Sequence, residues 1–214
     1  MKTIIKNTII LFAITLVAGL GLGFVYNVTL DARAAQEEKT KIEAYQSVMA
    51  GMDSFETVVL DSKKIQTYIE EKVQKVESEH NISVIKPFAA TIDEVVLAKD
   101  AKGAELGYIV TVTDNEAYSG SLQMAVGISK DKTVQGISFL TLSETPGLGM
   151  KAGEDSFKSQ FKMKKTDYFQ YQKSGAKADG EVNAISSATI TSNAVVHGVN
   201  GAIYCVEYLM GGGE

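Results

Sequence analysis

Cysteine and histidine, which hold most protein-bound metals, are nearly absent from this sequence. The 214 residues include one cysteine, Cys205, and two histidines, His80 and His197, that lie far apart in the chain. A single cysteine excludes an internal disulfide and a cysteine-based metal or iron–sulfur site, and two distant histidines argue against a zinc site. No metal site is therefore predicted, and any redox chemistry would require an organic cofactor.

The sequence also lacks an excess of basic residues. Its 26 acidic side chains outnumber the 21 basic ones, for a formal net charge of −5, and the basic residues form no cluster. We expect no nucleic-acid partner, because nucleic-acid binding needs a dense positive surface. Hydrophobic residues make up 45% of the chain, which is normal for a globular core, and the length suits one domain with appendages.

One long apolar run lies near the N-terminus. Residues 8–28 contain no charged side chain, and about 20 helical residues span the hydrocarbon core of a bilayer. Lys2 and Lys6 precede the run, so the positive-inside tendency predicts a cytoplasmic N-terminus and an extracytoplasmic remainder. The alternative is a cleaved signal peptide, but the run is longer than a signal core and residues 31–34 make a poor cleavage site. We expect residues 1–30 to form an uncleaved, single-pass anchor in the inner (cytoplasmic) membrane, in contact with lipid.

The remainder divides by its residue pattern. Residues 31–86 are rich in Glu, Lys and Gln with apolar positions at helical spacing, which predicts a helical stalk. Residues 87–210 are expected to form the main domain and residues 211–214 a loose tail. The expected fold class is α+β, because strand-like segments joined by short turns imply an antiparallel sheet packed with helices. The stalk is predicted to hold a helix that leaves the membrane and a second, charged helix near 62–80. The strands are predicted at 94–98, 106–113, 122–129 and 134–142, and the later helices at 151–163 and 192–210.

The last predicted helix carries one apolar stripe that should pack on the sheet. Val195, Val199 and Val206 belong to this stripe at helical spacing. His197 falls on the opposite face and is predicted to lie at the surface, while Cys205 is predicted to be a small core residue.

A cluster of hydroxyl side chains precedes this helix, in the sequence 183–192. The start of a helix offers free backbone N–H groups and the positive end of the helix dipole, which suit an anion such as phosphate. The alternative is an ordinary helix cap, for which a single Ser or Thr would suffice. Composition alone leaves both interpretations open.

A second unusual segment, residues 143–150, follows a predicted strand. Pro146 stiffens it, and Gly147 and Gly149 supply backbone freedom or room for a flat ligand. The alternative is a plain Pro-Gly turn.

Together the two segments resemble the FMN-binding domain family. Ser186-Ser187-Ala188-Thr189-Ile190-Thr191-Ser192 is similar to its flavinylation motif, usually Ser/Thr-Gly-Ala-Thr-x-Thr. Glu144-Thr145-Pro146-Gly147-Leu148-Gly149 is similar to its Glu-Thr-Pro-Gly-Leu-Gly loop, and residues 118–128 resemble its Tyr-Gly-Gly-x-Ile strand region. The resemblance covers roughly residues 90–208. The overall pattern, including the span and stalk, resembles the G subunits of Rnf complexes, the ion-translocating ferredoxin:NAD oxidoreductases of bacteria.

This resemblance implies one FMN joined through its phosphate to Thr189 by a dedicated flavin transferase. It implies electron transfer through the flavin with no catalytic side chain, alongside other membrane and redox subunits of the complex. Two departures from the usual motif are Asn183 in place of Asp and Ser187 in place of Gly. The implied cofactor-binding residues are Thr189, Thr191 and Ser192 around the phosphate, with Ser186, Ser187 and Ala188 beside them, and Glu144, Thr145, Gly147 and Leu148 along the flavin ring.

Three alternatives stay open at this point. The C subunit of the Na⁺-pumping NADH:quinone oxidoreductase has the same domain and flavin bond. A solitary membrane-tethered flavoprotein is a second alternative. A non-redox tethered module, in which Thr189 merely caps a helix, is the third, and it predicts no flavin.

Overall fold

A computed structural model describes residues 1–80, 87–173 and 175–212. By its internal contacts the chain divides into two units, Met1–Ile42 and Glu43–Glu214. The first unit lies entirely within helix α1, Lys2–Val48, apart from the initial methionine. Among the described residues, α1 holds the one stretch that is long and apolar enough to cross a membrane, and no part of that stretch is buried. This is consistent with a single-pass membrane anchor.

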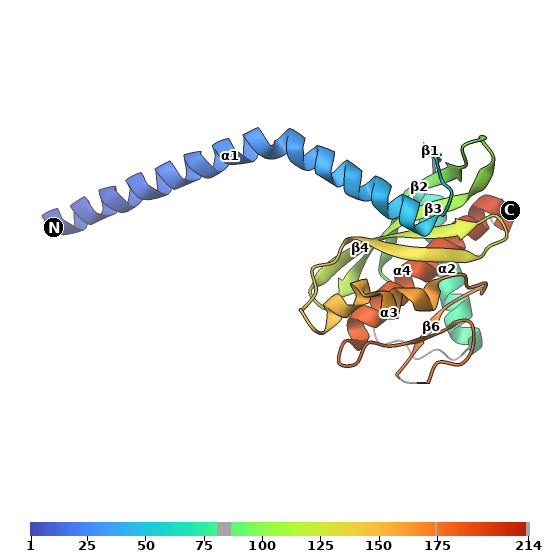
Figure 1. The fold of residues 1–214 in the computed structure, drawn as a ribbon. Helices are drawn as coiled ribbons and strands as arrows, with labels where there is room; N and C mark the ends of the chain where they lie inside the picture. The colour runs from blue at the N-terminus through green and yellow to red at the C-terminus, as the bar shows by residue number, and fades with distance from the viewer. Residues whose placement is uncertain (81–86, 174, 213–214) are drawn as a thin grey trace. The chain divides into compact units, whose positions relative to one another are not determined.

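A five-stranded antiparallel sheet forms the centre of the second unit (Figure 1). Its strands follow one another in sequence order, because each is joined to the next by a connection that reverses the chain. Four of them coincide with the strand-like segments predicted from the sequence, and the first, β1, was not predicted. The strands are β1 (Ser54–Thr57), β2 (Ala90–Lys99), β3 (Glu105–Ala117), β4 (Gly120–Ser129) and β5 (Val134–Thr141).

Helix α4, Thr189–Glu207, lies against one face of this sheet, and α2, Ser62–His80, packs beside it (Figure 1). The face is apolar because alternate strand residues such as Val110, Val112 and Val126 point into a shared core. Helix α2 contributes Ile65 and three further buried side chains to the same core. The α+β class is confirmed, whereas the separation of a stalk at residue 86 stays a prediction.

The opposite face of the sheet is covered by the end of α1 and the turn that follows. Tyr45 and Val48 are buried there, and the Tyr45 hydroxyl lies 2.7 Å from Thr111 Oγ1. Gly127 of β4 permits this close packing, since a Cβ atom at that position would lie 2.1 Å from the backbone oxygen of Val48. The sheet is therefore buried on both faces, which explains its many consecutive valines and isoleucines.

The segment between β5 and α4 is mostly irregular. The helix expected over residues 151–163 is broken into three short helical segments, two of them 3-10 and one α, so the prediction of one regular helix was wrong. Two short parallel strands follow and were not predicted. These elements are η1 (Gly149–Gly153), α3 (Asp155–Lys158), η2 (Ser159–Phe161), β6 (Gln170–Gln172) and β7 (Glu181–Asn183), and a π-type turn, η3 (Tyr208–Gly212), follows α4.

Candidate functional site

Helix α4 begins without a side-chain cap. Its N-cap residue is Ala188, which makes no capping hydrogen bond, and it is preceded by Ser187 with a positive φ of 63°. The Ser192 hydroxyl is used inside the loop instead, where it accepts from the Ile185 N–H at 2.9 Å and donates to the Ala188 carbonyl at 3.0 Å. The interpretation of the hydroxyl cluster as a simple cap is therefore wrong. The N–H groups of the first turn stay available to an anion.

The hydroxyl groups near this helix start have different surroundings. Thr191 is fully buried and donates to Glu144 Oε2 at 3.1 Å. Thr189, the first residue of α4, is half-buried, and its hydroxyl makes no hydrogen bond to any described residue. Ser187 is exposed and equally free of hydrogen bonds to the described residues. With Ser186, which is also exposed, three hydroxyl groups beside the uncapped helix end therefore make no hydrogen bond to the described residues.

Glu144 fastens three separate segments together. One carboxylate oxygen accepts from Thr191 on α4, and the other accepts from the backbone N–H of Ser119, at the β3–β4 hairpin, at 3.1 Å. Only 7% of Glu144 is exposed. Gly149 lies directly against this contact, because a Cβ there would be 2.4 Å from Glu144 Oε2 and 2.7 Å from Thr191 Oγ1. The loop and the helix start therefore form one rigid wall.

The Pro-Gly segment forms a tight turn on this wall. The Leu148 N–H donates to the Thr145 carbonyl at 3.1 Å, and Gly147 has a φ of 76°. A positive φ at the third residue, after proline at the second, is the pattern of a type II turn. The turn presents Leu148 on the surface, where 39% of the residue is exposed.

These elements enclose a pocket of about 360 Å³. Seven of the ten predicted cofactor residues line it, while Ser186, Gly147 and Ser192 do not. Ser192 and Gly147 shape the loops behind the lining, and Ser186 is exposed. Sequence reasoning gave no site role to Tyr118 or Ile190, although the resemblance in residues 118–128 pointed at the first, and it expected Gly149 to supply backbone freedom or room for a flat ligand. The lining residues are Tyr118, Glu144, Thr145, Leu148, Gly149, Ser187, Ala188, Thr189, Ile190 and Thr191.

The chemistry of the lining fits a phosphate ester with an attached flat ring. No lysine or arginine belongs to it, so the phosphate charge would be met by first-turn N–H groups and the helix dipole. Leu148, Ile190 and the ring of Tyr118 supply apolar surface for a ring system, and Tyr118 is 68% exposed at the hairpin tip. No group of three or more metal-ligating side chains occurs within the described ranges.

Asn183, one of the two departures from the usual motif, lies at the end of β7 outside the pocket. Its side-chain oxygen accepts from the Ala176 N–H at 2.9 Å, a role that an Asp carboxylate could also fill. The other departure, Ser187, occupies a left-handed backbone conformation. This explains why glycine is usual there, because glycine adopts positive φ without strain.

The prediction that His197 lies at the surface was wrong. It is only 7% exposed, because Phe88 and Asp114 of β3 lie against its ring and residues of α2 and of the segment around β6 line the cleft beside it. Burial lowers the pKa of His197 to about 4 and raises the pKa of the neighbouring Asp114 to about 6. Cys205 is fully buried, as predicted, and burial raises the pKa of its thiol to about 12.

Residues 117–204 match the FMN-binding domain family. Over 97% of its length the chain is 32% identical to the G subunit of the Na(+)-translocating ferredoxin:NAD(+) oxidoreductase complex of Acetobacterium woodii, of which it covers 94%. Over 52% of its length it is 36% identical to the G subunit of the proton-translocating ferredoxin:NAD(+) oxidoreductase complex of Clostridium ljungdahlii, of which it covers 60%.

A solved structure of the C subunit of a Na(+)-translocating NADH-quinone reductase, from Parabacteroides distasonis, is similar in fold. The TM-score is 0.51 at 22% identity, covering 82% of this chain and 94% of that one. At this identity the likeness shows the fold alone.

Proposed function

Because the chain belongs to the G-subunit family of ion-translocating ferredoxin:NAD(+) oxidoreductase complexes, we propose that it carries one FMN on Thr189 and relays electrons within such a complex. The observation that carries this proposal is the free hydroxyl of Thr189 at the uncapped start of α4, inside a pocket in the matched domain. A phosphoester at this hydroxyl would hold its phosphate against the first-turn N–H groups.

The residues of the chain hold and orient the cofactor and perform no bond chemistry on a substrate. Glu144 holds the start of α4 in place through its hydrogen bond to Thr191. Thr189, the attachment point, and the Pro-Gly turn therefore keep a fixed separation. Thr145 and Leu148 would lie along the ring, while Thr189 holds the phosphate. Bound FMN supplies electron transfer through its flavin ring, and a fixed position would give the electron a constant distance to its partners.

We further propose that α1 anchors the subunit, with its N-terminus in the cytoplasm and the FMN domain outside the inner membrane. Lys2 and Lys6 on the N-terminal side support this orientation. A covalent bond, made by a flavin transferase, suits that compartment because lost FMN could not easily be replaced there. The apolar run 8–28 carries no charged residue, so the coupling ion would be handled by other membrane subunits.

A C subunit of a Na⁺-translocating NADH:quinone reductase is the second candidate, favoured by the shared fold. The two candidates differ in partners. Affinity purification of the tagged full chain from its native membrane should recover subunits of a ferredoxin:NAD oxidoreductase. Recovery of NADH:quinone reductase subunits would favour the second candidate, and recovery of no membrane partner would favour a solitary flavoprotein.

The flavin bond is tested by in-gel fluorescence. The full chain is coexpressed with its flavin transferase, denatured, separated on a gel and viewed under ultraviolet light. The wild type and the Ser187→Ala and Thr191→Val variants should fluoresce, because each keeps the hydroxyl at position 189. Thr189→Val is nearly isosteric and should be dark. A dark wild type, or a dark Ser187→Ala beside a fluorescent Thr189→Val, would refute the assignment.

A further inference from the structure

A second cleft lies on the α4 side that faces α2 and β6. It encloses about 330 Å³ and shares no lining residue with the pocket at the helix start. Its lining includes residues of all three elements together with Phe88, which precedes β2. A cleft of this size is at the lower end of the range for small-molecule sites.

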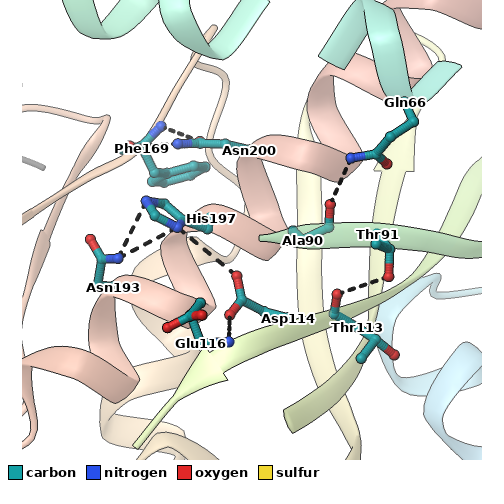
Figure 2. A network of polar contacts seen from close by, with 10 residues as sticks. All are labelled: Gln66, Ala90, Thr91, Thr113, Asp114, Glu116, Phe169, Asn193, His197 and Asn200. Atoms are coloured by element: carbon teal, nitrogen blue, oxygen red, sulfur yellow. Dashed lines mark hydrogen bonds and ion pairs between the residues drawn. The ribbon is translucent and has the colours of Figure 1, made fainter. Parts of the chain in front are cut away.

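Aromatic side chains make up much of the cleft wall. Phe169 and Tyr204 are buried, and Phe88 and Tyr171 are partly buried. Asn200 holds the Phe169 backbone on α4 through two hydrogen bonds, of 2.7 and 2.9 Å. Figure 2 shows the two residues side by side. The two bonds fix one wall of the cleft. Rings arranged in this way favour a flat ligand, because flat molecules stack on or pack edge-on against aromatic faces.

Besides Glu77, Gln170, Gln172, Lys173 and Asn200, the polar part of the lining includes Asn193 and His197, which lie one turn apart on α4. They are 4% and 7% exposed, respectively. The Asn193 amide nitrogen lies 3.4 Å from Nδ1 and 3.3 Å from Nε2 of His197 (Figure 2). One amide group cannot point at both ring nitrogens along their lone pairs, so the contact leaves hydrogen-bonding capacity unused. The Asn193 carbonyl oxygen has no hydrogen-bond partner among the described residues.

A carboxylate stands behind the imidazole. Asp114 is fully buried, and its Oδ2 has no hydrogen-bond partner among the described residues but lies 3.9 Å from His197 Nδ1. Its Oδ1 accepts from the Glu116 N–H at 2.8 Å. A carboxylate on that side favours the tautomer with the proton on Nδ1, which leaves Nε2 as an acceptor. With this tautomer the Asn193 amide donates to His197 Nε2 at 3.3 Å, and a ligand hydroxyl would replace this contact by inserting between the two groups, while the Asn193 carbonyl oxygen adds an acceptor beside them.

From this arrangement we propose that the cleft is a second small-molecule site, which takes a flat, neutral aromatic molecule bearing a phenol-type hydroxyl. The hydroxyl would donate to His197 Nε2 and accept from the Asn193 amide, and the ring would lie among Phe88, Phe169 and Tyr171. An anionic ligand is disfavoured, because Asp114 contributes negative charge behind the base. Glu77 and Lys173 line the cleft with opposite charges, so they give no net preference for a charged ligand.

The test uses β-naphthol, with naphthalene as the matched probe that lacks the hydroxyl. The full chain carrying its flavin is purified in detergent micelles, and binding is measured by equilibrium dialysis against empty micelles. A site that hydrogen-bonds a hydroxyl discriminates against the analogue without it. We expect β-naphthol to bind about tenfold or more tightly than naphthalene, which corresponds to one good hydrogen bond. Equal binding of the two probes, or no saturable binding, would overturn the proposal.

Variants and spectroscopy locate the bound probe. His197→Leu and Asn193→Leu should each remove the preference for β-naphthol. Thr189→Val, which alters only the first pocket, should keep it. The chain has only two histidines, so imidazole NMR signals report the site directly: β-naphthol should shift the His197 signals and leave those of His80 in place. This holds even if a variant folds poorly. Unshifted His197 signals under saturating β-naphthol would refute the assignment, and so would loss of the preference in Thr189→Val.

Discussion

Replacing Gly149 by alanine tests how tightly the site is built. The added methyl carbon would lie 2.4 Å from Glu144 Oε2 and 2.7 Å from Thr191 Oγ1, well inside van der Waals contact. It would also lie 2.8 Å from Glu144 Cβ, so the carboxylate cannot relieve the clash by moving its tip alone. The Glu144 side chain must therefore shift, and its hydrogen bond to Thr191 would break.

The cost follows from two effects. Overpacking a tight site costs about 1–3 kcal/mol, and losing a hydrogen bond to a buried charged group costs about 1.5–3 kcal/mol. The movement of Glu144 that breaks the hydrogen bond also relieves part of the overpacking, so the two costs do not add in full. We expect the free energy of unfolding to fall by about 3 kcal/mol. For a unit of this size that lowers the melting temperature by roughly 6–12 °C. Flavin attachment should also fall, because the wall beside Thr189 is displaced.

Thermal unfolding of the full chain in detergent, followed by the tyrosine circular dichroism signal, measures the loss. In-gel flavin fluorescence measures attachment. Gly136→Ala is the matched control, since a Cβ at that position meets no heavy atom within 4 Å. It should change the melting temperature by no more than about 2 °C. A Gly149→Ala variant that melts with the wild type and labels fully would refute the described contact between Glu144 and Thr191.

Three further predictions concern other parts of the fold. Ser187→Gly should raise the melting temperature, since relief of a non-glycine positive φ of 63° is worth about 1 kcal/mol; an unchanged or lower value would contradict this. Gly127→Ala should lower the melting temperature strongly, because its Cβ would lie 2.1 Å from a backbone atom. Gly198→Ala should lower it less, since its Cβ meets the flexible end of a methionine side chain. A larger loss in Gly198→Ala than in Gly127→Ala would refute this reasoning. The raised pKa of Asp114 stabilises the fold below pH 3.8, and this contribution is lost as pH rises through about 6. The lowered pKa of His197 stabilises above pH 6.5, and this contribution is lost as pH falls through about 4. The two oppose each other between pH 4 and 6. We therefore expect the free energy of unfolding of each variant, measured in urea and taken relative to the wild type, to change between pH 4 and 6. As pH rises it should increase by roughly 3 kcal/mol for Asp114→Asn and decrease by roughly 3 kcal/mol for His197→Leu. Changes of the same sign in the two variants would contradict the account.

The sheet could be predicted because strand-forming residue types and the short turns between them are local signals. The strand from Glu105 to Ala117 and the turn at residues 130–132 follow from residue types that lie next to each other in the sequence. The four-residue strand β1 is too short to show a pattern, and it is a strand because β2 pairs with it. The region 151–163 has helical composition but forms only short, interrupted helical segments, since tertiary packing of Phe157 and Phe161 overrides weak local preference.

Helix α4 shows where pattern analysis fails. Its apolar stripe predicts a single buried face, yet every residue from Thr191 to Val206 is buried. The sequence shows only that His197 and Asn193 are polar, and burial on that side depends on elements distant in the chain. When the polar residues of a buried helix face a cleft, only the structure shows that the helix is enclosed on all sides.

The candidate site was predictable in its parts and not in its assembly. The two motifs contain most of the residues that line the pocket. The hydrogen bond between Glu144 and Thr191, however, joins residues 47 positions apart, and no spacing rule predicts that contact. The free state of the Thr189 hydroxyl, beside engaged hydroxyls on Thr191 and Ser192, also emerges only from the hydrogen bonds of the described residues.

Peptide mapping by mass spectrometry tests the central claim most directly. Full-length protein matured with its flavin transferase is digested, and the peptide that contains residues 183–192 is fragmented. The account predicts that this peptide is heavier by one FMN less one water, with the added mass on Thr189. An unmodified peptide, or the added mass on Ser187 or Thr191, would contradict it.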